Sequence, residues 1–257
     1  MSEPPGIDLE IRGRVAWVTI NRPHRMNALS TASFARLVDV VLEIDAHDDI
    51  RVAVFTGAGE RAFSAGVDLK EMDVAGRMTH PMGGSLRNAN EVILEMAKPT
   101  IAAINGIAVG GGCELALACD LRIAAETAAM GLPEAKVGLG ANFASVILPQ
   151  LIPRAIAMEL LFTGALISAE KAHALGLVNR VTSQKDLAQV AMSLATQIAD
   201  NAPLSVQRMK AVASKSQGLP HAAALRLGVG PNPYTSEDRI EGVRAFAEKR
   251  RPNFRGI

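Results

Sequence analysis

Three short apolar runs rich in β-branched residues constrain the fold more than any other feature of this chain. They span residues 15–20, 52–56 and 100–104, and each ends at a turn or glycine signal, which is the pattern of a buried strand. Between the first two runs, Ser30 or Thr31 stands where a helix cap is expected. Apolar residues then follow at helical spacing, at Phe34, Leu37, Val38, Val41 and Leu42. This alternation predicts an α/β fold.

The C-terminal third carries a different pattern. After about Pro149 the strand signals fade and helical spacing takes over, with Ser168 and Asp186 as expected helix caps. Prolines are expected to start or end these helices at Pro203, Pro220, Pro231 and Pro233. Earlier in the chain, residues 70–85 show no strand pattern and contain the sequence HPMGG, so we expect a loop that borders a functional site.

Length and charge narrow the possible functions. The chain has 257 residues, enough for one large domain or for a domain with an appendage. A formal net charge of +1 argues against nucleic acid or an anionic membrane as the main partner. The first ten residues lack the charged start and apolar core of a signal peptide, and no stretch reaches the length of a membrane span. We therefore expect a cytoplasmic protein.

The cysteines and histidines do not form a metal-binding pattern. Cys113 and Cys119 lie six residues apart, which in a helix separates their Cα atoms by about 9 Å, beyond disulfide reach. They do not form a CxxC pair, and the five histidines show neither HxxxH nor HExxH spacing. The sequence therefore predicts two small buried cysteines and no metal site.

The most informative segment reads AAINGIAVGGGCELALACD, from Ala102 to Asp120. A predicted strand runs into three glycines, and a helix-prone stretch follows. Glycines let backbone N–H groups approach a ligand closely, and a helix N-terminus favours negative charge, so we expect an oxyanion donor at Gly111. Glu114 is flanked by apolar and small residues, which predicts burial and a raised pKa, as suits a general acid or base. The alternative is a tight turn followed by an ordinary first-turn acid.

A second carboxylate follows twenty residues later, in the sequence Gly131-Leu132-Pro133-Glu134. Taken alone, a proline and an acid at a helix start are ordinary features of a first turn. Two carboxylates in one water-poor site, however, can divide the acceptor and donor roles that the addition of water requires. Sequence spacing does not show whether Glu114 and Glu134 meet.

A third segment, AFSAGVDLK, follows the second predicted strand. Gly66 frees the backbone there, so that the N–H of Val67 can point into a cleft. None of these glycine segments contains GxxxxGK[ST] or GxGxxG, which argues against a phosphate-binding loop and a dinucleotide site. Ser64 lacks the GxSxG context of a hydrolase nucleophile.

An ordered set of segments extends along nearly the whole chain: NRPHRMNAL, AFSAGVDLKEM, KPTIAAINGIAVGGGCELALACD, GLPE, FTGALISAEKAHALGLVNRV and EDRIEGVRAFAEKRRPNFRG. This set, in this order, resembles the enoyl-CoA hydratase (crotonase) family. The resemblance implies a spiral of ββα units with two roughly perpendicular sheets and a C-terminal helical region that forms homotrimers, commonly paired into hexamers. We accordingly expect a catalytic core at 1–195 and a helical trimerisation region at 196–257.

The resemblance also implies a reaction and its residues. The two thioester-oxygen donors of the family fall on the backbone N–H groups of Val67 and Gly111, and its two catalytic glutamates fall on Glu114 and Glu134. The implied reaction is hydration of a 2-enoyl-CoA, with CoA as part of the substrate and no metal or redox cofactor. The residues expected to bind the CoA ester are Arg25, Met26, Ala65, Val67, Asp68, Leu69, Lys70, Gly110, Gly111 and, from a neighbouring subunit, Phe246 and Lys249.

One segment departs from the family pattern. After the second glutamate many hydratases carry a glycine-rich turn, whereas this chain has Asn142 and Phe143. If the segment from Glu134 onward is helical, these residues follow it by about two turns, so we expect them to shape the acyl end of the pocket; packing of Phe143 in the core is the alternative. A Δ3,Δ2-enoyl-CoA isomerase, and a non-catalytic CoA-binding or nucleic-acid-binding paralogue, remain the competing functions.

Overall fold

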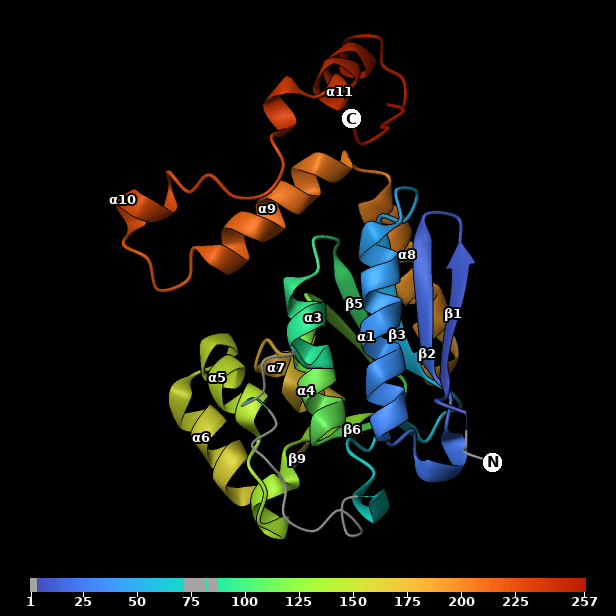
Figure 1. Ribbon diagram of the computed structural model, residues 1–257, viewed down its shortest axis with the longest axis vertical. Helices are drawn as coiled ribbons and strands as arrows, with labels where there is room; N and C mark the ends of the chain where they lie inside the picture. The colour runs from blue at the N-terminus through green and yellow to red at the C-terminus, as the bar shows by residue number, and fades with distance from the viewer. Residues whose placement is uncertain (1–3, 72–81, 83–86) are drawn as a thin grey trace.

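The computed structural model describes residues 4–71, 82 and 87–257 (Figure 1). A six-stranded sheet has the order β1-β2-β3-β5-β7-β10. Only its first pair is antiparallel, and the other neighbours run parallel. Its strands are β1 (Ile7–Arg12), β2 (Val15–Ile20), β3 (Val52–Gly57), β5 (Thr100–Ile104), β7 (Leu121–Ala125) and β10 (Arg180–Thr182). The three apolar runs are therefore the strands β2, β3 and β5, as predicted.

A second, four-stranded sheet has the order β4-β6-β8-β9. Its strands are β4 (Ala62–Ser64), β6 (Ile107–Val109), β8 (Ala129–Gly131) and β9 (Leu166–Ser168). The strands β4, β6 and β8 are parallel neighbours, so their carboxyl ends meet at one edge of the sheet. Together the two sheets and their connecting helices make an α/β fold of the predicted class.

Helices cover both faces of the larger sheet (Figure 1). On one face α1 (Thr31–Ala46) packs against α3 (Ala89–Glu95), which packs against α4 (Gly111–Ala118). On the other face α8 (Leu187–Ala199) packs against β2, β3, β5 and β7. Because both faces are covered, the central strands are mainly apolar, and β3 and β5 are buried along their whole length.

The helix α1 forms where the sequence predicted it, and Ser30 is its cap. Ser30 caps the helix by accepting a hydrogen bond from Ser33 N at 3.0 Å. The buried stripe is Leu37, Val40, Val41 and Ile44, which follow i, i+3, i+4 and i+7 spacing. Leu42 lies outside this stripe and is 48% exposed.

The C-terminal third is mostly helical, with two short strands that the sequence pattern did not indicate. These are β9 and β10, each only three residues long and therefore without a recognisable strand pattern. Ser168 caps α7 (Ala169–Ala174), as predicted. Asp186 occupies the N-cap position of α8, as predicted, but its carboxylate accepts a bond from Ser183 Oγ and makes no cap bond. Among the described residues, the core also contains α5 (Asn142–Leu151) and α6 (Arg154–Thr163).

Beyond α8 the chain leaves the two sheets. The helices α9 (Pro203–Lys215), α10 (His221–Ala224) and α11 (Glu237–Ala247) form an arm that projects from the core (Figure 1). Lys210 of α9 ties this arm to the core through Asp120 Oδ2, at 2.7 Å, and the carbonyl of Lys98. The predicted division between residues 195 and 196 falls within α8, whose Ala195 and Ala199 are both buried.

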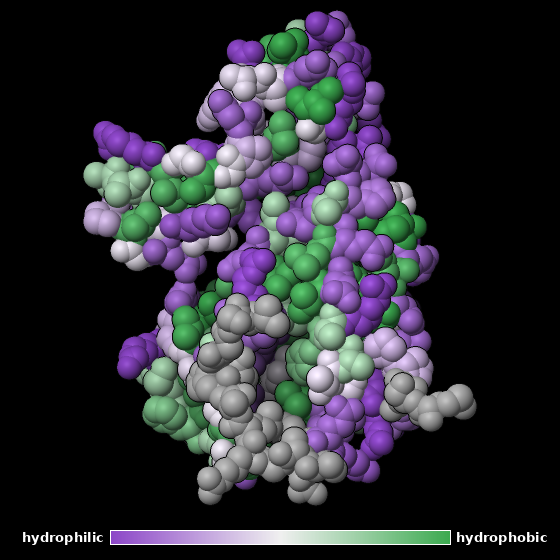
Figure 2. Space-filling model, viewed as in Figure 1, coloured by the Kyte–Doolittle hydropathy of each residue, from purple (hydrophilic) through white to green (hydrophobic). Residues whose placement is uncertain are grey.

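The arm exposes apolar side chains (Figure 2). Neither α9 nor α10 buries a residue, and Leu225 and Phe246 are 85% and 88% exposed. In the part of the chain that the structure describes, no helix combines the length and the apolar character needed to cross a membrane.

Candidate active site

Three segments singled out in the sequence meet at the carboxyl edge of the smaller sheet. The strand β4 leads into Ala65, Gly66 and Val67, β6 leads into Gly110 and the start of α4, and β8 leads into Glu134. Since β4, β6 and β8 are parallel neighbours, they deliver these segments to the same place. The topology thus explains why residues almost seventy positions apart lie together.

The backbone of Gly66 packs directly on the start of α4. Gly66 has φ +82°, and a Cβ atom there would lie 2.8 Å from Gly111 N and 2.8 Å from Val109 O. No side chain can be accommodated in that space, which makes glycine necessary at position 66 for both conformation and packing. A Cβ atom on Gly111 would in turn lie 3.6 Å from Val67 N. The backbone nitrogens of Val67 and Gly111 are therefore neighbours.

Both N–H groups are available for a ligand. Val67 forms a parallel bridge with Leu29, but the two bonds of that bridge run from Leu29 N to Gly66 O and from Asp68 N to Leu29 O. Neither bond uses the Val67 N–H. Gly111 is the first residue of α4, where an N–H group has no acceptor within the helix. The two N–H groups predicted as oxyanion donors therefore lie close together.

Glu114 lies in the first turns of α4 and is largely buried. Its Oε1 accepts a hydrogen bond from Ala144 N at 3.0 Å, and the Phe143 N–H also contributes. Burial raises the pKa of Glu114 to about 7, with a further rise from the negative charge of Glu134, while the two N–H groups lower it. A carboxyl group with such a pKa can exchange a proton near neutral pH.

Glu134 lies in the short 3-10 helix η2 (Pro133–Val137). Its Oε1 is 3.5 Å from the position that a Cβ atom on Gly110 would take, so its carboxyl group lies beside the start of α4. Its Oε2 is buried and has no hydrogen-bond partner among the described residues. Burial raises the pKa of Glu134, which favours its protonated form. The structure therefore brings the two predicted carboxylates to one site.

Cys113 lies next to Glu114, and the charges of both carboxylates affect the pKa of its thiol. Burial, followed by the negative charges of Glu134 and Glu114, raises the pKa of its thiol to about 12. The thiol is therefore protonated at neutral pH and is not a nucleophile. Cys113 and Cys119 are both free and buried, as predicted. Across the described ranges, no three His, Cys, Asp or Glu side chains are grouped so that they could hold a metal ion.

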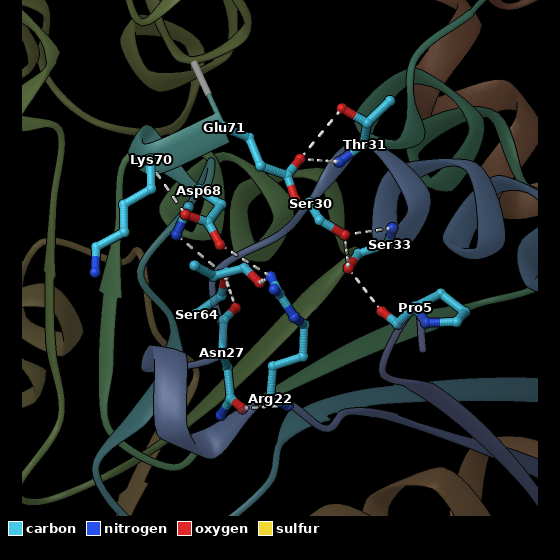
Figure 3. A network of polar contacts seen from close by, with 12 residues as sticks. Pro5, Arg22, Asn27, Ser30, Thr31, Ser33, Ser64, Asp68, Lys70 and Glu71 are labelled. Atoms are coloured by element: carbon cyan, nitrogen blue, oxygen red, sulfur yellow. Dashed lines mark hydrogen bonds and ion pairs between the residues drawn. The ribbon is translucent and has the colours of Figure 1, made fainter. Parts of the chain in front are cut away.

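Most residues predicted to bind CoA lie around the Val67 loop. Arg25 and Met26 end the short helix η1 (Pro23–Arg25), and the Met26 carbonyl accepts a bond from Ala65 N at 3.0 Å. Leu69 and Lys70 follow Val67 closely in the chain and are exposed. Asp68 differs, because its carboxylate is buried and turned inward, where Oδ2 lies 3.3 Å from Arg22 and Oδ1 accepts from Lys70 N. Its carboxylate therefore points toward Arg22 and the start of its own helix turn (Figure 3).

Phe246 and Lys249 do not reach this site within one chain. Phe246 lies on α11 and Lys249 just after it, at the far end of the arm from α4 (Figure 1). Both side chains are exposed. Their predicted role on a neighbouring subunit stays a prediction.

The segment after Glu134 is not one continuous helix, so the spacing on which we placed Asn142 and Phe143 in the acyl pocket is wrong. η2 ends at Val137, Gly138 adopts φ +72°, and α5 begins only at Asn142. Phe143 is buried in the hydrophobic core. Its side chain thus follows the packing alternative, while Asn142 stays partly exposed beside Gly140, whose carbonyl accepts from its Nδ2. The predicted loop at 70–85 lies mainly outside the described residues.

Sequence reasoning missed the donors to Glu114 and the residues that hold the Val67 loop. Ala144 acts through its backbone, for which no side-chain signal exists. Ser64 and Arg22 were visible in the AFSAG and NRP segments, but their contacts depend on the tertiary structure.

Comparisons with known proteins show which family the chain resembles along nearly its whole length. A sequence model of the Enoyl-CoA hydratase/isomerase family matches residues 10–256. The chain is 45% identical to (E)-benzylidenesuccinyl-CoA hydratase of Thauera aromatica, covering 97% of this chain and 99% of that one. It is 39% identical to carnitinyl-CoA dehydratase of Salmonella typhi, covering 100% of both chains.

Solved structures give the same result. The crystal structure of an enoyl-CoA hydratase from Mycobacterium tuberculosis matches with a TM-score of 0.89 and 39% identity, covering 98% of this chain and 100% of that chain. An enoyl-CoA hydratase from Bacillus anthracis matches with a TM-score of 0.88 and 37% identity over the same shares. The expected crotonase-like fold is therefore confirmed.

Proposed function

Because the chain belongs to the enoyl-CoA hydratase/isomerase family, whose members act on acyl-CoA thioesters, we propose that it hydrates a 2-trans-enoyl-CoA to a 3-hydroxyacyl-CoA. One observation carries this proposal. Two partly buried carboxyl groups with raised pKa lie beside two backbone N–H groups that have no acceptor among the described residues. Addition of water to an enoyl thioester needs a proton acceptor, a proton donor and a site for the enolate oxygen.

The Val67 and Gly111 N–H groups bind the thioester oxygen in this scheme. Attack of water at C3 moves electron density onto that oxygen and forms an enolate. Donors that are already in position stabilise this charge without reorganisation, and the loss of one such donor costs about 10²-fold or more in rate.

The two glutamates divide the proton transfers. Glu114 removes a proton from the attacking water as the hydroxyl adds to C3, since its pKa of about 7 leaves a working fraction ionised at neutral pH. Ala144 holds one oxygen of Glu114, and we assign the other oxygen to the water. Glu134 then donates its proton to C2, consistent with the lack of a hydrogen-bond donor to its Oε2. Each step is an addition or a proton transfer, so the scheme uses no redox cofactor.

A substrate assay identifies the acyl group. The relatives' names refer to a benzylidenesuccinyl-CoA and to a carnitinyl-CoA, so a substrate panel needs aryl-substituted and charged acyl groups beside straight chains. A Δ3,Δ2-enoyl-CoA isomerase is the second candidate, because the matching family includes isomerases and the same oxyanion site serves both reactions.

A homotrimer or hexamer in the cytoplasm completes the proposal. The arm from α9 to α11 exposes apolar side chains that a neighbouring subunit would cover. In such an assembly Phe246 and Lys249 would reach the adenosine phosphate end of a CoA bound to a neighbour.

Product identification tests the reaction. The purified protein is incubated with 2-enoyl-CoA and 3-enoyl-CoA thioesters. The products are separated, and their molecular masses are measured. Hydration predicts a gain of one water by the 2-enoyl-CoA. Conversion of the 3-enoyl-CoA to the 2-enoyl-CoA without uptake of water would support the isomerase instead. No turnover of either class would overturn both.

A further inference from the structure

We propose that Ser64 and the buried ion pair of Arg22 with Asp68 are positioning residues that aim the Val67 N–H at the thioester oxygen. This inference rests on the proposed function, since it concerns one of the two oxyanion donors. None of the three side chains is exposed: Ser64 is fully buried, and Arg22 and Asp68 are 3% and 7% exposed (Figure 3). Because all three side chains are buried, their polar groups bond to other parts of the protein and not to solvent.

Ser64 fixes the backbone just before Val67. Its Oγ accepts a hydrogen bond from Gly66 N at 3.1 Å, which closes a local turn two residues long. The same Oγ donates to the Asn27 carbonyl at 2.8 Å. One hydroxyl therefore connects the strand β4, the glycine that precedes Val67 and the segment at 27–29.

Leu29 sets the direction of the Val67 N–H. The Gly66 carbonyl accepts a hydrogen bond from Leu29 N at 2.7 Å. This carbonyl and the Val67 N–H belong to the same peptide unit, which is planar and trans, so they point in opposite directions. Binding the carbonyl to Leu29 on one side therefore turns the Val67 N–H to the other side, toward Gly111.

The ion pair holds Leu29 in place relative to Val67. Arg22 Nη1 donates to the Ala28 carbonyl at 2.7 Å and lies 3.3 Å from Asp68 Oδ2. It therefore connects the residue before Leu29 with the residue after Val67. Asp68 N also donates to the Leu29 carbonyl at 3.0 Å, so the two segments are joined through both backbone and side chains.

These bonds matter for rate because an oxyanion donor acts only when it is well aligned. A displacement of about 1 Å can reduce catalysis about 10²-fold. Gly66 has no side chain to restrict its own backbone, and its left-handed φ of +82° adds no rigidity. The surrounding hydrogen bonds therefore supply the stiffness that the Gly66–Val67 peptide lacks.

The test measures the carbonyl stretching frequency of a bound acyl-CoA thioester by isotope-edited infrared spectroscopy, together with kcat and KM. Hydrogen bonds to the thioester oxygen lower this frequency. We expect Ser64→Ala to lose about half of the lowering seen with the wild type and to reduce kcat about tenfold, with KM changed less than threefold. Ser33→Ala is the matched control, because Ser33 is also fully buried and its hydroxyl donates to the Pro5 carbonyl (Figure 3).

The outcomes separate the two proposals. If the wild type itself shows no lowering of the frequency, the oxyanion site of the proposed function is wrong. If the wild type shows the lowering and Ser64→Ala matches both the wild type and Ser33→Ala in frequency and kcat, the positioning role is wrong. Should Ser64→Ala fail to fold, the near-isosteric Asp68→Asn decides by the same readouts, with a smaller lowering supporting the role and an unchanged frequency overturning it.

Discussion

The backbone N–H of Ala144 donates a hydrogen bond to Glu114 Oε1 at 3.0 Å, so the first turn of α5 holds the carboxylate that α4 presents. The positive end of the α5 dipole adds to this effect. The two helices together keep a buried carboxyl group partly ionised, because burial raises its pKa and the N–H groups oppose that rise. This balance gives the residue a pKa of about 7.

Ala144→Pro removes this hydrogen bond without breaking a bond within α5, because first-turn N–H groups have no helical acceptor. We expect the pKa of Glu114 to rise and the acid limb of the pH profile of kcat/KM to move to higher pH, since catalysis needs the ionised form. Ala155→Pro, in the first turn of α6, is the control for proline itself. An acid limb at the same pH in Ala144→Pro and the wild type would show that Ala144 does not tune Glu114.

The raised pKa of Glu114 also affects stability. The folded protein binds this proton more tightly than the unfolded chain, whose carboxyl group titrates at about 4.5. The free energy of unfolding therefore falls as pH rises from about 4.5 through 7. Glu114→Gln lacks this pH dependence. The free energy of unfolding of the variant, relative to that of the wild type, should therefore be about 1–3 kcal/mol higher at pH 8 than at pH 4.

Urea unfolding at the two pH values measures this effect, and Glu159→Gln provides the control, because Glu159 is exposed on α6. A pH-independent difference between Glu114→Gln and the wild type would contradict the raised pKa.

Phe143→Ala should destabilise the protein without changing its substrate preference, because Phe143 packs in the core. Phe143 is 5% exposed and belongs to the hydrophobic core, so its truncation is expected to cost about 3–5 kcal/mol of stability. The ratio of kcat/KM between short and long enoyl-CoA substrates should stay the same. Phe162→Ala, at a position 74% exposed on α6, should change the melting temperature little. A shifted substrate ratio in a well-folded Phe143→Ala protein would restore Phe143 to the acyl pocket.

The proposed trimer or hexamer gives Lys249 a role that can be tested. Light scattering should show a trimer or hexamer, and Lys249→Ala should raise KM about tenfold for a CoA thioester but not for the matching pantetheine thioester, which lacks the adenosine phosphate. Lys185→Ala, which removes another exposed lysine, should raise neither KM. A stable and active monomer would remove Phe246 and Lys249 from the site.

The sequence predicted those parts of the site whose residues are neighbours in the chain. The glycines at 110–112 and Glu114 lie close together in the chain, so their arrangement at the start of α4 follows from local rules. The separate strand β6 that leads into them was not predicted, because the strand expected before the glycines was the run at 100–104, which is β5. The meeting of Glu114 with Glu134 was only a hypothesis, because it depends on the pairing of β6 with β8. Apolar periodicity does not specify which strands become neighbours.

Three further features of the site could not be foreseen from the sequence, for separate physical reasons. Phe143 was placed in a pocket on the assumption of one helix after Glu134, but the left-handed Gly138 interrupts that segment. Asp68 was expected to bind CoA, and its buried pairing with Arg22 could not be foreseen because the two residues lie 46 positions apart. The backbone donor Ala144 carries no signature in its side chain.

The central claim is that Glu114 and Glu134 jointly catalyse hydration at the Val67 and Gly111 N–H groups. The most direct test measures kcat for hydration of a 2-enoyl-CoA by Glu114→Gln and Glu134→Gln, with the Kd of a non-reactive acyl-CoA determined in parallel and Glu159→Gln as the control. The account predicts that each variant loses about two to four orders of magnitude in kcat while Kd stays within a few-fold of the wild type. Near-wild-type turnover by either variant would contradict it.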